Sequence, residues 1–367
     1  MKQLESTFQL KKDNQELDDY IEGAFGPFFL SLADIRPYFL NPEIKESQMI
    51  SLIQEMSTKF TKKRDQIGDY VLDEDRVSSY TALYLPTNIP KLHFLLSKLP
   101  KEMLDDISSR PFIDIGCGPG TYALGINLLL KGKVKDVTCV DSSKVMLAQA
   151  QKIVNGFFPD VNLKTQHRYR EVNSSSVLFY GHSINEIGID QVEDQILTVD
   201  PEYVIFIEPG TSALFTELKK LREDLISRYD VIYPCPSNKA CPSSWCHQVL
   251  RTAHDSSIER LSQLVSLDRK ILPMTAHVYR KKCNDFKERN EATIVRFIIE
   301  TKFSFEYEVC LFNNGTNENV IFEIQKKHLS KSDEKMFKNF NVGEKINFTL
   351  DKLVGGKWRV KLSVINS

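Results

Sequence analysis

Three cysteines lie close together in this chain, at Cys235, Cys241 and Cys246, and a proline follows each of the first two. Thiolates are soft ligands that hold zinc, copper or iron–sulfur clusters. Proline stiffens a loop and removes a competing amide donor. Structural zinc sites usually have cysteine pairs at closer spacing than this, whereas iron–sulfur clusters, also held by cysteine thiolates, tolerate wider loops. The stretch therefore predicts a metal or iron–sulfur site.

A fourth ligand must come from elsewhere in the chain. His247 is adjacent to Cys246, which makes it difficult for both side chains to reach one centre, so His247 is expected to support the site from outside. Cys283 lies in a polar, basic stretch, and Cys310 ends a β-like run. Geometry alone leaves the choice between these two cysteines open. The chain has seven cysteines, an odd number, and no export signal, so reduced thiols are expected.

A glycine-rich segment, Asp114-Ile115-Gly116-Cys117-Gly118-Pro119-Gly120-Thr121, offers a second kind of chemistry. Glycine lets the backbone turn sharply and lets a ligand lie against it. A dinucleotide-binding fingerprint would have glycine where Thr121 stands. The segment instead resembles the cofactor loop of S-adenosylmethionine-binding methyltransferases, and the alternative is a tight turn that binds nothing. The resemblance implies that the cofactor is bound by Asp114, Gly116, Gly118, Gly120 and Asp141, with Asp141 accepting hydrogen bonds from the ribose.

No residue can be assigned to catalysis from the sequence. Amino- and base-directed methyltransferases commonly end their fourth strand with Asp or Asn, two prolines and an aromatic residue, and no such tetrapeptide occurs here. Asn185 or Glu186 could lie beside a methyl acceptor, but Ser183 followed by Glu186 also matches a capping box at a helix start. Methyl transfer can rely largely on positioning. The sequence therefore does not decide whether the chain is an active methyltransferase.

The elements that must position these residues alternate from Pro111 onward. Strand-like runs are expected at 112–115, 137–140, 161–165, 177–180 and 203–207, with helices near 122–130, 145–154, 187–197 and 213–226. This alternation predicts an α/β fold with a mainly parallel, Rossmann-like sheet between helices. The preceding residues, 1–110, are expected to be helical, and the prolines at 86, 90 and 100 favour several short helices over one long one.

After about residue 227 the alternation stops. A helix is expected near 246–254, and β-like runs at 293–299, 303–312, 320–324, 346–350 and 358–364 predict a small antiparallel sheet or barrel. The predicted organisation is an N-terminal helical region (1–110), a methyltransferase-like α/β domain (111–230), a cysteine-rich metal-binding segment (231–291) and a basic C-terminal β module (292–367).

Charge is unevenly distributed along the chain. From Arg269 to the end there are 19 Lys and Arg against 12 Asp and Glu, which leaves 29 against 37 for residues 1–268. A basic module favours an anionic partner such as RNA, although lysine also protects exposed strand edges. No apolar run reaches membrane-spanning length, and residues 1–23 lack signal- or transit-peptide features. A cytoplasmic protein without a membrane partner is expected.

Several blocks, taken in order, resemble a known family. They are Tyr80–Pro86, Asp114–Thr121, Glu208–Thr211, the Cys-Pro, Cys-Pro and Trp-Cys-His elements at 235–247, and the strand that ends in Cys310. Over about residues 75–350 they resemble the methyltransferase-like ribosomal small-subunit assembly proteins of mitochondria and bacteria. Ser237 and Ser244 depart from the family pattern, which often has His and Asp at these positions.

This resemblance carries specific expectations. It implies a 4Fe–4S cluster held by four cysteines, with Cys310 matching the fourth ligand better than Cys283. It also implies bound S-adenosylmethionine and a factor that contacts ribosomal RNA during assembly of, or translation by, the small ribosomal subunit. The chain itself is expected to be monomeric. The alternative is an active S-adenosylmethionine-dependent rRNA methyltransferase.

Overall fold

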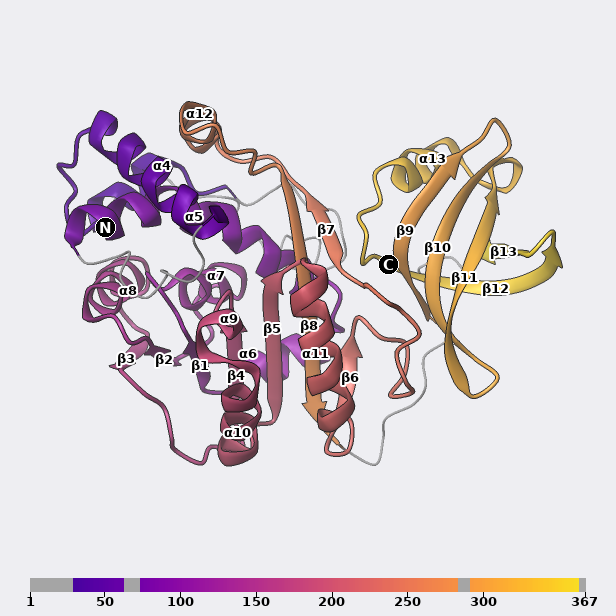
Figure 1. Cartoon of the computed structure of the whole chain (residues 1–367), viewed down its shortest axis with the longest axis horizontal. Helices are drawn as coiled ribbons and strands as arrows, with labels where there is room; N and C mark the ends of the chain where they lie inside the picture. Colours follow the sequence, from indigo (N-terminus) through magenta and orange to yellow (C-terminus); the bar gives the residue numbers. More distant parts are fainter. Residues whose placement is uncertain (1–28, 63–72, 283–290, 363–367) are drawn as a thin grey trace. The chain divides into compact units, whose positions relative to one another are not determined.

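The computed structural model of the chain describes residues 29–62, 73–282 and 291–362 (Figure 1). Contacts divide the chain into two compact units, Met1–Ile187 with Thr252–Ile271, and Gly188–Arg251 with Leu272–Ser367. Cys283, the alternative fourth ligand, lies outside the described residues, and so do the first 28 residues of the expected helical region.

The first unit contains four parallel strands in the order β3-β2-β1-β4. Strands β1 and β4 are buried along their whole length, as expected for apolar strands covered on both faces. This order is the 3-2-1-4 half of a Rossmann-type sheet, so the predicted parallel α/β fold is confirmed. The strands are β1 (Phe112–Ile115), β2 (Asp136–Val140), β3 (Asn162–Gln166) and β4 (Val177–Gly181).

Helices surround these strands and form the region before them. Every helix among the described residues is too short or too polar to cross a lipid bilayer. The helices of the first unit are α3 (Leu32–Ile35), η1 (Arg36–Tyr38), α4 (Glu46–Lys62), α5 (Glu74–Leu96), α6 (Lys101–Ser108), α7 (Thr121–Leu129), α8 (Lys144–Phe157), α9 (Ile184–Ile187) and α12 (Ser256–Leu264).

Helix α5 shows that the prediction of several short helices was wrong. It continues through Pro86 and Pro90, which lack the amide hydrogen that an interior helical residue normally donates. Asp73 caps its first turn by accepting a hydrogen bond from the Arg76 amide at 2.8 Å. Most of the helix is buried, and it packs against α4, α7, α8 and α12. Tertiary packing therefore outweighs the unfavourable propensity of the two prolines.

The second unit contains a smaller antiparallel arrangement of strands. Strand β8 pairs with β5 on one side and with β6 on the other, and β7 also pairs with β8. The sequence predicted neither β6 nor β8, and the helix expected near 246–254 was wrong because β7 occupies this stretch. The elements are α10 (Ile189–Val199), β5 (Tyr203–Pro209), α11 (Ser212–Leu225), β6 (Tyr229–Tyr233), β7 (Gln248–Arg251) and β8 (Ile271–Lys281).

A closed barrel follows β8 along the chain (Figure 1). It corresponds to the C-terminal β module that was predicted as a small sheet or barrel. Its strand order is β10-β11-β13-β12-β9, with antiparallel pairing throughout except between β11 and β13, which are parallel. The elements are β9 (Glu291–Glu300), β10 (Ser304–Asn313), β11 (Thr316–Gln325), η3 (Lys326–His328), α13 (Lys331–Lys338), β12 (Lys345–Val354) and β13 (Lys357–Leu362).

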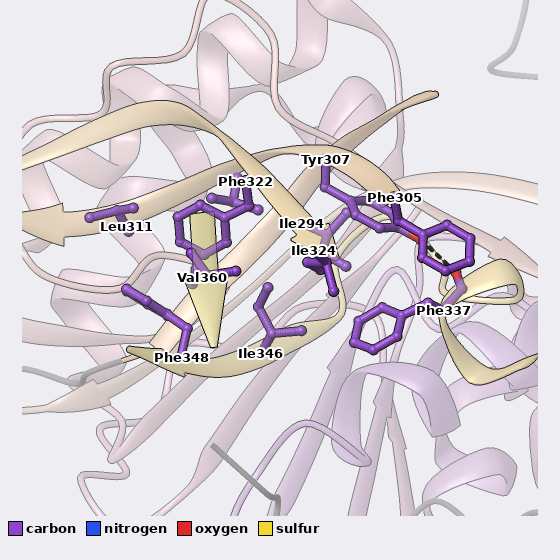
Figure 2. Packing of buried hydrophobic residues seen from close by; sticks show 12 residues of the cluster. Ile294, Phe305, Tyr307, Leu311, Phe322, Ile324, Phe337, Ile346, Phe348 and Val360 are labelled. Carbon is purple, nitrogen blue, oxygen red and sulfur yellow. Dashed lines mark hydrogen bonds between the residues drawn. The ribbon is translucent and has the colours of Figure 1, made fainter. Parts of the chain in front are cut away.

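Alternating side chains of the barrel strands fill its interior (Figure 2). The Phe322 and Phe348 rings meet at 4.8 Å between centroids. Phe337 of α13 packs against this core, and its carbonyl accepts a hydrogen bond from the Tyr307 hydroxyl. Because strand side chains alternate between faces, the residues between the core positions on β10 and β11 point out of the barrel.

Candidate functional site

The turn between β1 and α7 needs glycine at three positions. Gly116, Gly118 and Gly120 have φ values of +69°, +52° and +83°, which side-chain-bearing residues rarely adopt. A Cβ at Gly116 would lie 2.3 Å from the Ser183 Cβ, and one at Gly120 would lie 3.0 Å from the Ala150 backbone. No atom lies within 4 Å of a Cβ placed at Gly118. Two glycines thus permit close packing, and the third leaves open space over the loop.

Asp141, at the end of β2, lies directly against this loop. Its Oδ2 accepts a hydrogen bond from the Gly118 amide at 2.9 Å, and its Oδ1 accepts one from the Ser143 amide at 2.8 Å. Burial raises the pKa of Asp141, while both hydrogen bonds oppose the rise. Carboxylate oxygens each have more than one acceptor site. Asp141 can therefore hold the loop and still accept hydrogen bonds from a ligand's hydroxyls.

Asp114 is fully buried below the same loop. Its Oδ2 accepts a hydrogen bond from the Ala123 amide, in the first turn of α7, at 3.1 Å. Within the described part of the chain, its Oδ1 is buried and has no hydrogen-bond partner. Burial, helped by the charge of Asp141, raises the pKa of Asp114 to about 8. An unsatisfied buried oxygen is unfavourable, so a donor from a ligand or from water would stabilise this group.

A half-buried histidine follows β4, where the sequence had offered Asn185 and Glu186. His182 has a φ of +58°, and its Nε2 lies 3.0 Å from the Lys91 Nζ. Burial lowers the pKa of His182, and the nearby Lys91 and Arg269 lower it further. Asn185 and Glu186 are both exposed. Sequence reasoning missed His182 and Lys91, because they are 91 positions apart and only the fold brings them together.

The cysteine loop, residues 235–246, begins after β6 in the second unit. All six cysteines of the described residues are free thiols. Cys310 follows Val309 on β10, and Val309 and Leu311 both point into the barrel core, so Cys310 lies on the outer face. His247 stacks on Trp245 with ring centroids 4.4 Å apart, which gives this histidine an aromatic partner.

Hydrogen bonds fasten the cysteine loop to the outer face of β11. The Ser237 Oγ donates to the Asn317 Oδ1 at 2.7 Å, and the Asn319 Nδ2 donates to the Ser243 Oγ at 3.0 Å. Asn319 is the residue directly opposite Cys310 in the β10–β11 register. The loop therefore lies over the part of the barrel that carries Cys310.

Arg222 of α11 supports the loop from the other side. Its side chain is 1% exposed, and its Nη2 donates to the Ser237 and Lys239 carbonyls at 3.0 and 2.7 Å. Burial is the largest influence and lowers its pKa, but Cys235, Tyr279 and Glu223 together outweigh burial, so the pKa of Arg222 lies above its ordinary value. No local sequence signal marks this arginine. The fold thus places a permanent cation beside the thiols.

The four predicted cysteine ligands form one electrostatic group. Burial raises the pKa of Cys235, Cys246 and Cys310, and Cys241 raises each of them further. In the described ranges, no three His, Cys, Asp or Glu side chains are already arranged as a metal site. Four soft donors beside a buried cation nevertheless suit an anionic metal–thiolate centre. Cys310 lies on the barrel face to which the cysteine loop is hydrogen-bonded, whereas Cys283 lies outside the described residues.

Comparison with known proteins gave one family and several similar folds. The model of the family described as mitochondrial small ribosomal subunit Rsm22 matches residues 74–354, more than half of the chain. No curated protein gave a significant match.

Three of the similar solved structures are described as methyltransferases. A candidate RNA methyltransferase from Pyrococcus horikoshii is 14% identical, with 54% of this chain and 86% of that chain covered and a TM-score of 0.36. A candidate class I S-adenosylmethionine-dependent methyltransferase from Listeria monocytogenes is also 14% identical, with coverage of 76% and 91% and a TM-score of 0.35. An S-adenosylmethionine-dependent methyltransferase from Thiobacillus denitrificans, solved with S-adenosyl-L-homocysteine, is 12% identical, with coverage of 50% and 93% and a TM-score of 0.30. All these TM-scores are below 0.5, and no functional conclusion rests on them.

Proposed function

Because the chain belongs to the Rsm22 family of the mitochondrial small ribosomal subunit, we propose that it is an assembly or translation factor of the small ribosomal subunit that contacts ribosomal RNA. One observation carries this proposal: the family match spans residues 74–354 and so includes the glycine loop, the cysteine loop and the barrel strands through β12. The excess of Lys and Arg after residue 268 supports it, because cations bind the phosphate backbone.

Gradient sedimentation of the tagged full-length protein in cell extract tests this function. The protein is expected to migrate with small-subunit particles at low salt and to leave them as salt rises, because added counterions weaken phosphate contacts. Large-subunit fractions of the same gradient are the control and should lack it. Migration at the top of the gradient under low salt would contradict the proposal.

S-adenosylmethionine is the cofactor in this proposal, bound by Asp114, Gly116, Gly118, Gly120 and Asp141. Open space over Gly118 and the spare acceptor sites of Asp141 support this assignment. In equilibrium binding experiments, Asp141→Ala should lower the affinity for S-adenosylmethionine at least about tenfold, which corresponds to a loss of about 1.4 kcal/mol in binding free energy. Exposed Asp160→Ala is the matched control and should bind normally. Equal affinity in the two variants would refute this cofactor site.

A 4Fe–4S cluster held by Cys235, Cys241, Cys246 and Cys310 is the second cofactor in this proposal. Four buried or half-buried thiols around one loop and one strand match its ligand requirement. When bound, such a cluster would cross-link the cysteine loop to β10. Arg222 would offset its negative charge, and Asn317 and Asn319 hold the loop in register with Cys310. The cluster thus serves as a structural clasp.

An active rRNA methyltransferase is the alternative function. The observation that favours it is the His182–Lys91 pair, since the next residue, Ser183, packs against Gly116 of the cofactor loop. This alternative predicts transfer of a labelled methyl group to ribosomal RNA, and loss of that transfer in Asp141→Ala. If Asp141→Ala binds no cofactor but still enters small-subunit particles, methyl transfer is not what assembly requires.

The proposal also covers the compartment and the oligomeric state. The sequence-based expectation is a cytoplasmic monomer without a membrane partner, whereas the family description is mitochondrial. Cell fractionation of the full-length protein decides between the compartments, and recovery in the mitochondrial matrix would overturn the cytoplasmic expectation. Light scattering should give a mass near 42.2 kDa for the purified chain, and twice that mass would contradict a monomer.

A further inference from the structure

The C-terminal barrel has the topology of an OB-fold. Its first strand pairs with the second and the fourth, the third and fifth strands are parallel, and a helix, α13, lies between the third and fourth strands. OB-folds bind oligonucleotides on the face of strands two and three and with the loops that join strands one to two and four to five. In this chain, these features are the outer face of β10 and β11 and the loops at 301–303 and 355–356.

The usual OB-fold binding face is occupied here by the protein itself. On the outer face of β10 and β11, the cysteine loop covers Cys310, Asn317 and Asn319 and is fastened there through Ser237 and Ser243. An RNA strand cannot use this region without displacing the cysteine loop.

Three carboxylates, each in an ion pair, lie on the rest of that face. Glu306, Glu308 and Glu323 alternate with core residues of β10 and β11 and so point outward. Each of these carboxylates is paired with a cation: Lys357 at 2.6 Å, Arg296 at 2.8 Å and Arg359 at 3.1 Å, respectively. These three ion pairs leave their cations already neutralised, so this part of the face offers a phosphate no unpaired positive charge.

Residues of the β9–β10 loop line a hollow of about 930 Å³ at the barrel surface. Its wall has more cations than carboxylates, which favours an anionic ligand. The charged lining residues are Lys302, Lys326, Lys327, Arg359, Glu323 and Glu334.

Two of these cations and one aromatic ring are available to a ligand. Lys326 and Arg359 are paired with Glu300 and Glu323. Lys302 and Lys327 are exposed and form no ion pair within the described residues. Phe303 projects from the loop with 73% of its surface exposed, and the Lys302 Nζ lies 5.6 Å from its ring centroid. An exposed aromatic ring beside cations is the arrangement with which proteins bind unstacked bases and their phosphates.

We propose that this hollow binds a single-stranded segment of RNA, with a base stacked on Phe303 and phosphates held by Lys302 and Lys327. Single-stranded RNA is favoured over duplex because only an unpaired, unstacked base can lie against an aromatic side chain. This inference rests on the proposed ribosomal function and names the surface and the form of RNA involved.

Fluorescence anisotropy of the full-length protein with a labelled single-stranded RNA of about 12 nucleotides tests the inference. Phe303→Ala should weaken binding by about 5- to 150-fold, the range expected for the loss of one base–aromatic stack. The double variant Lys302→Glu with Lys327→Glu should weaken binding and reduce its salt dependence. Leu353→Ala and Lys352→Glu are the matched controls, since both residues are exposed on β12 outside the hollow. They should bind like the wild type.

Two results would overturn the inference. One is unchanged affinity in Phe303→Ala, and the other is equal weakening by the control variants, which would place the RNA elsewhere on the barrel. If the hollow variants keep RNA affinity but lose a ribosomal protein in pull-downs, the hollow binds protein and the inference fails. If the wild type migrates with small subunits but does not bind the RNA, the inference fails and the proposed function stands. Failure to migrate with small subunits contradicts the proposed function itself.

Discussion

Asp114 has a charge state that the fold around it controls. Burial, with a smaller contribution from Asp141, raises its pKa to about 8, and one of its oxygens has no hydrogen-bond partner among the described residues. The folded state therefore keeps a proton that the unfolded state loses near pH 4. A group with a raised folded-state pKa stabilises the fold at low pH, and this contribution is lost as the pH rises from about 4 to about 8.

Asp114→Asn should remove this dependence. Without cofactor, the free energy of unfolding of the wild type should fall relative to that of the variant as the pH rises from about 5 to about 8. The difference is on the order of 1.4 kcal/mol for each pH unit crossed within that window. Urea titrations at several pH values measure it, with exposed Asp160→Asn as the control. Parallel curves for wild type and Asp114→Asn would show that Asp114 does not titrate in this way.

Replacing Arg222 should lower stability and iron content more than replacing Arg228, which follows α11 in the chain. Arg222→Met removes the charged donor of the Ser237 and Lys239 carbonyls, which still accept hydrogen bonds from the Asn317 Nδ2. Each hydrogen bond lost from a charged group costs roughly 1.5–3 kcal/mol. We expect a lower melting temperature and less bound iron after anaerobic purification. Arg228→Met is the control because Arg228 is exposed. If both variants behave alike in calorimetry and iron content, the role given to Arg222 is wrong.

From the sequence, site residues could be proposed only where they carry their own local signal. Glycines before a helix and cysteines beside prolines are recognisable from neighbouring residues alone. Arg222, Asn319 and the His182–Lys91 pair are not, because their partners are distant in the chain and only tertiary structure brings them together. The supporting part of each site therefore could not be predicted.

At the scale of elements, predictions succeeded where periodicity was strong. The strands of the first unit and of the barrel were expected close to their observed ranges. Strand β7 has only four residues, too few for periodicity to separate strand from helix. The continuity of helix α5 was not predicted for a different reason, since its buried surface outweighs two prolines. Both errors arise where pairing or packing with distant elements decides the structure.

Side chains of β11 alternate between the inside and the outside of the barrel, and two substitutions can test this assignment. Phe322 is fully buried against Phe348, whereas the preceding residue, Ile321, points outward and is half-buried. Phe322→Ala should destabilise the protein by about 3–5 kcal/mol because it leaves a cavity. Ile321→Ala should cost clearly less. Chemical denaturation measures both, and a reversed order of the two variants would mean that the register of β11 is wrong.

At the scale of the whole molecule, the cysteine loop unites α11, β6 and the barrel within the second unit. If a cluster clasps this loop to β10, its removal should free the loop. Limited trypsin digestion after iron chelation should then cleave after the exposed Lys239 faster than in the loaded protein. Cleavage elsewhere in the chain serves as the internal control. An unchanged rate after Lys239 would show that hydrogen bonds alone hold the loop.

In the proposed function, four cysteines, including Cys310 of the barrel, hold an iron–sulfur cluster. Iron and acid-labile sulfide measured after anaerobic purification test it most directly. The wild type should contain iron and sulfide in comparable amounts, Cys310→Ser should lose both, and Cys283→Ser should keep them. Zinc without sulfide in the wild type, or loss of iron in Cys283→Ser but not in Cys310→Ser, would contradict the claim.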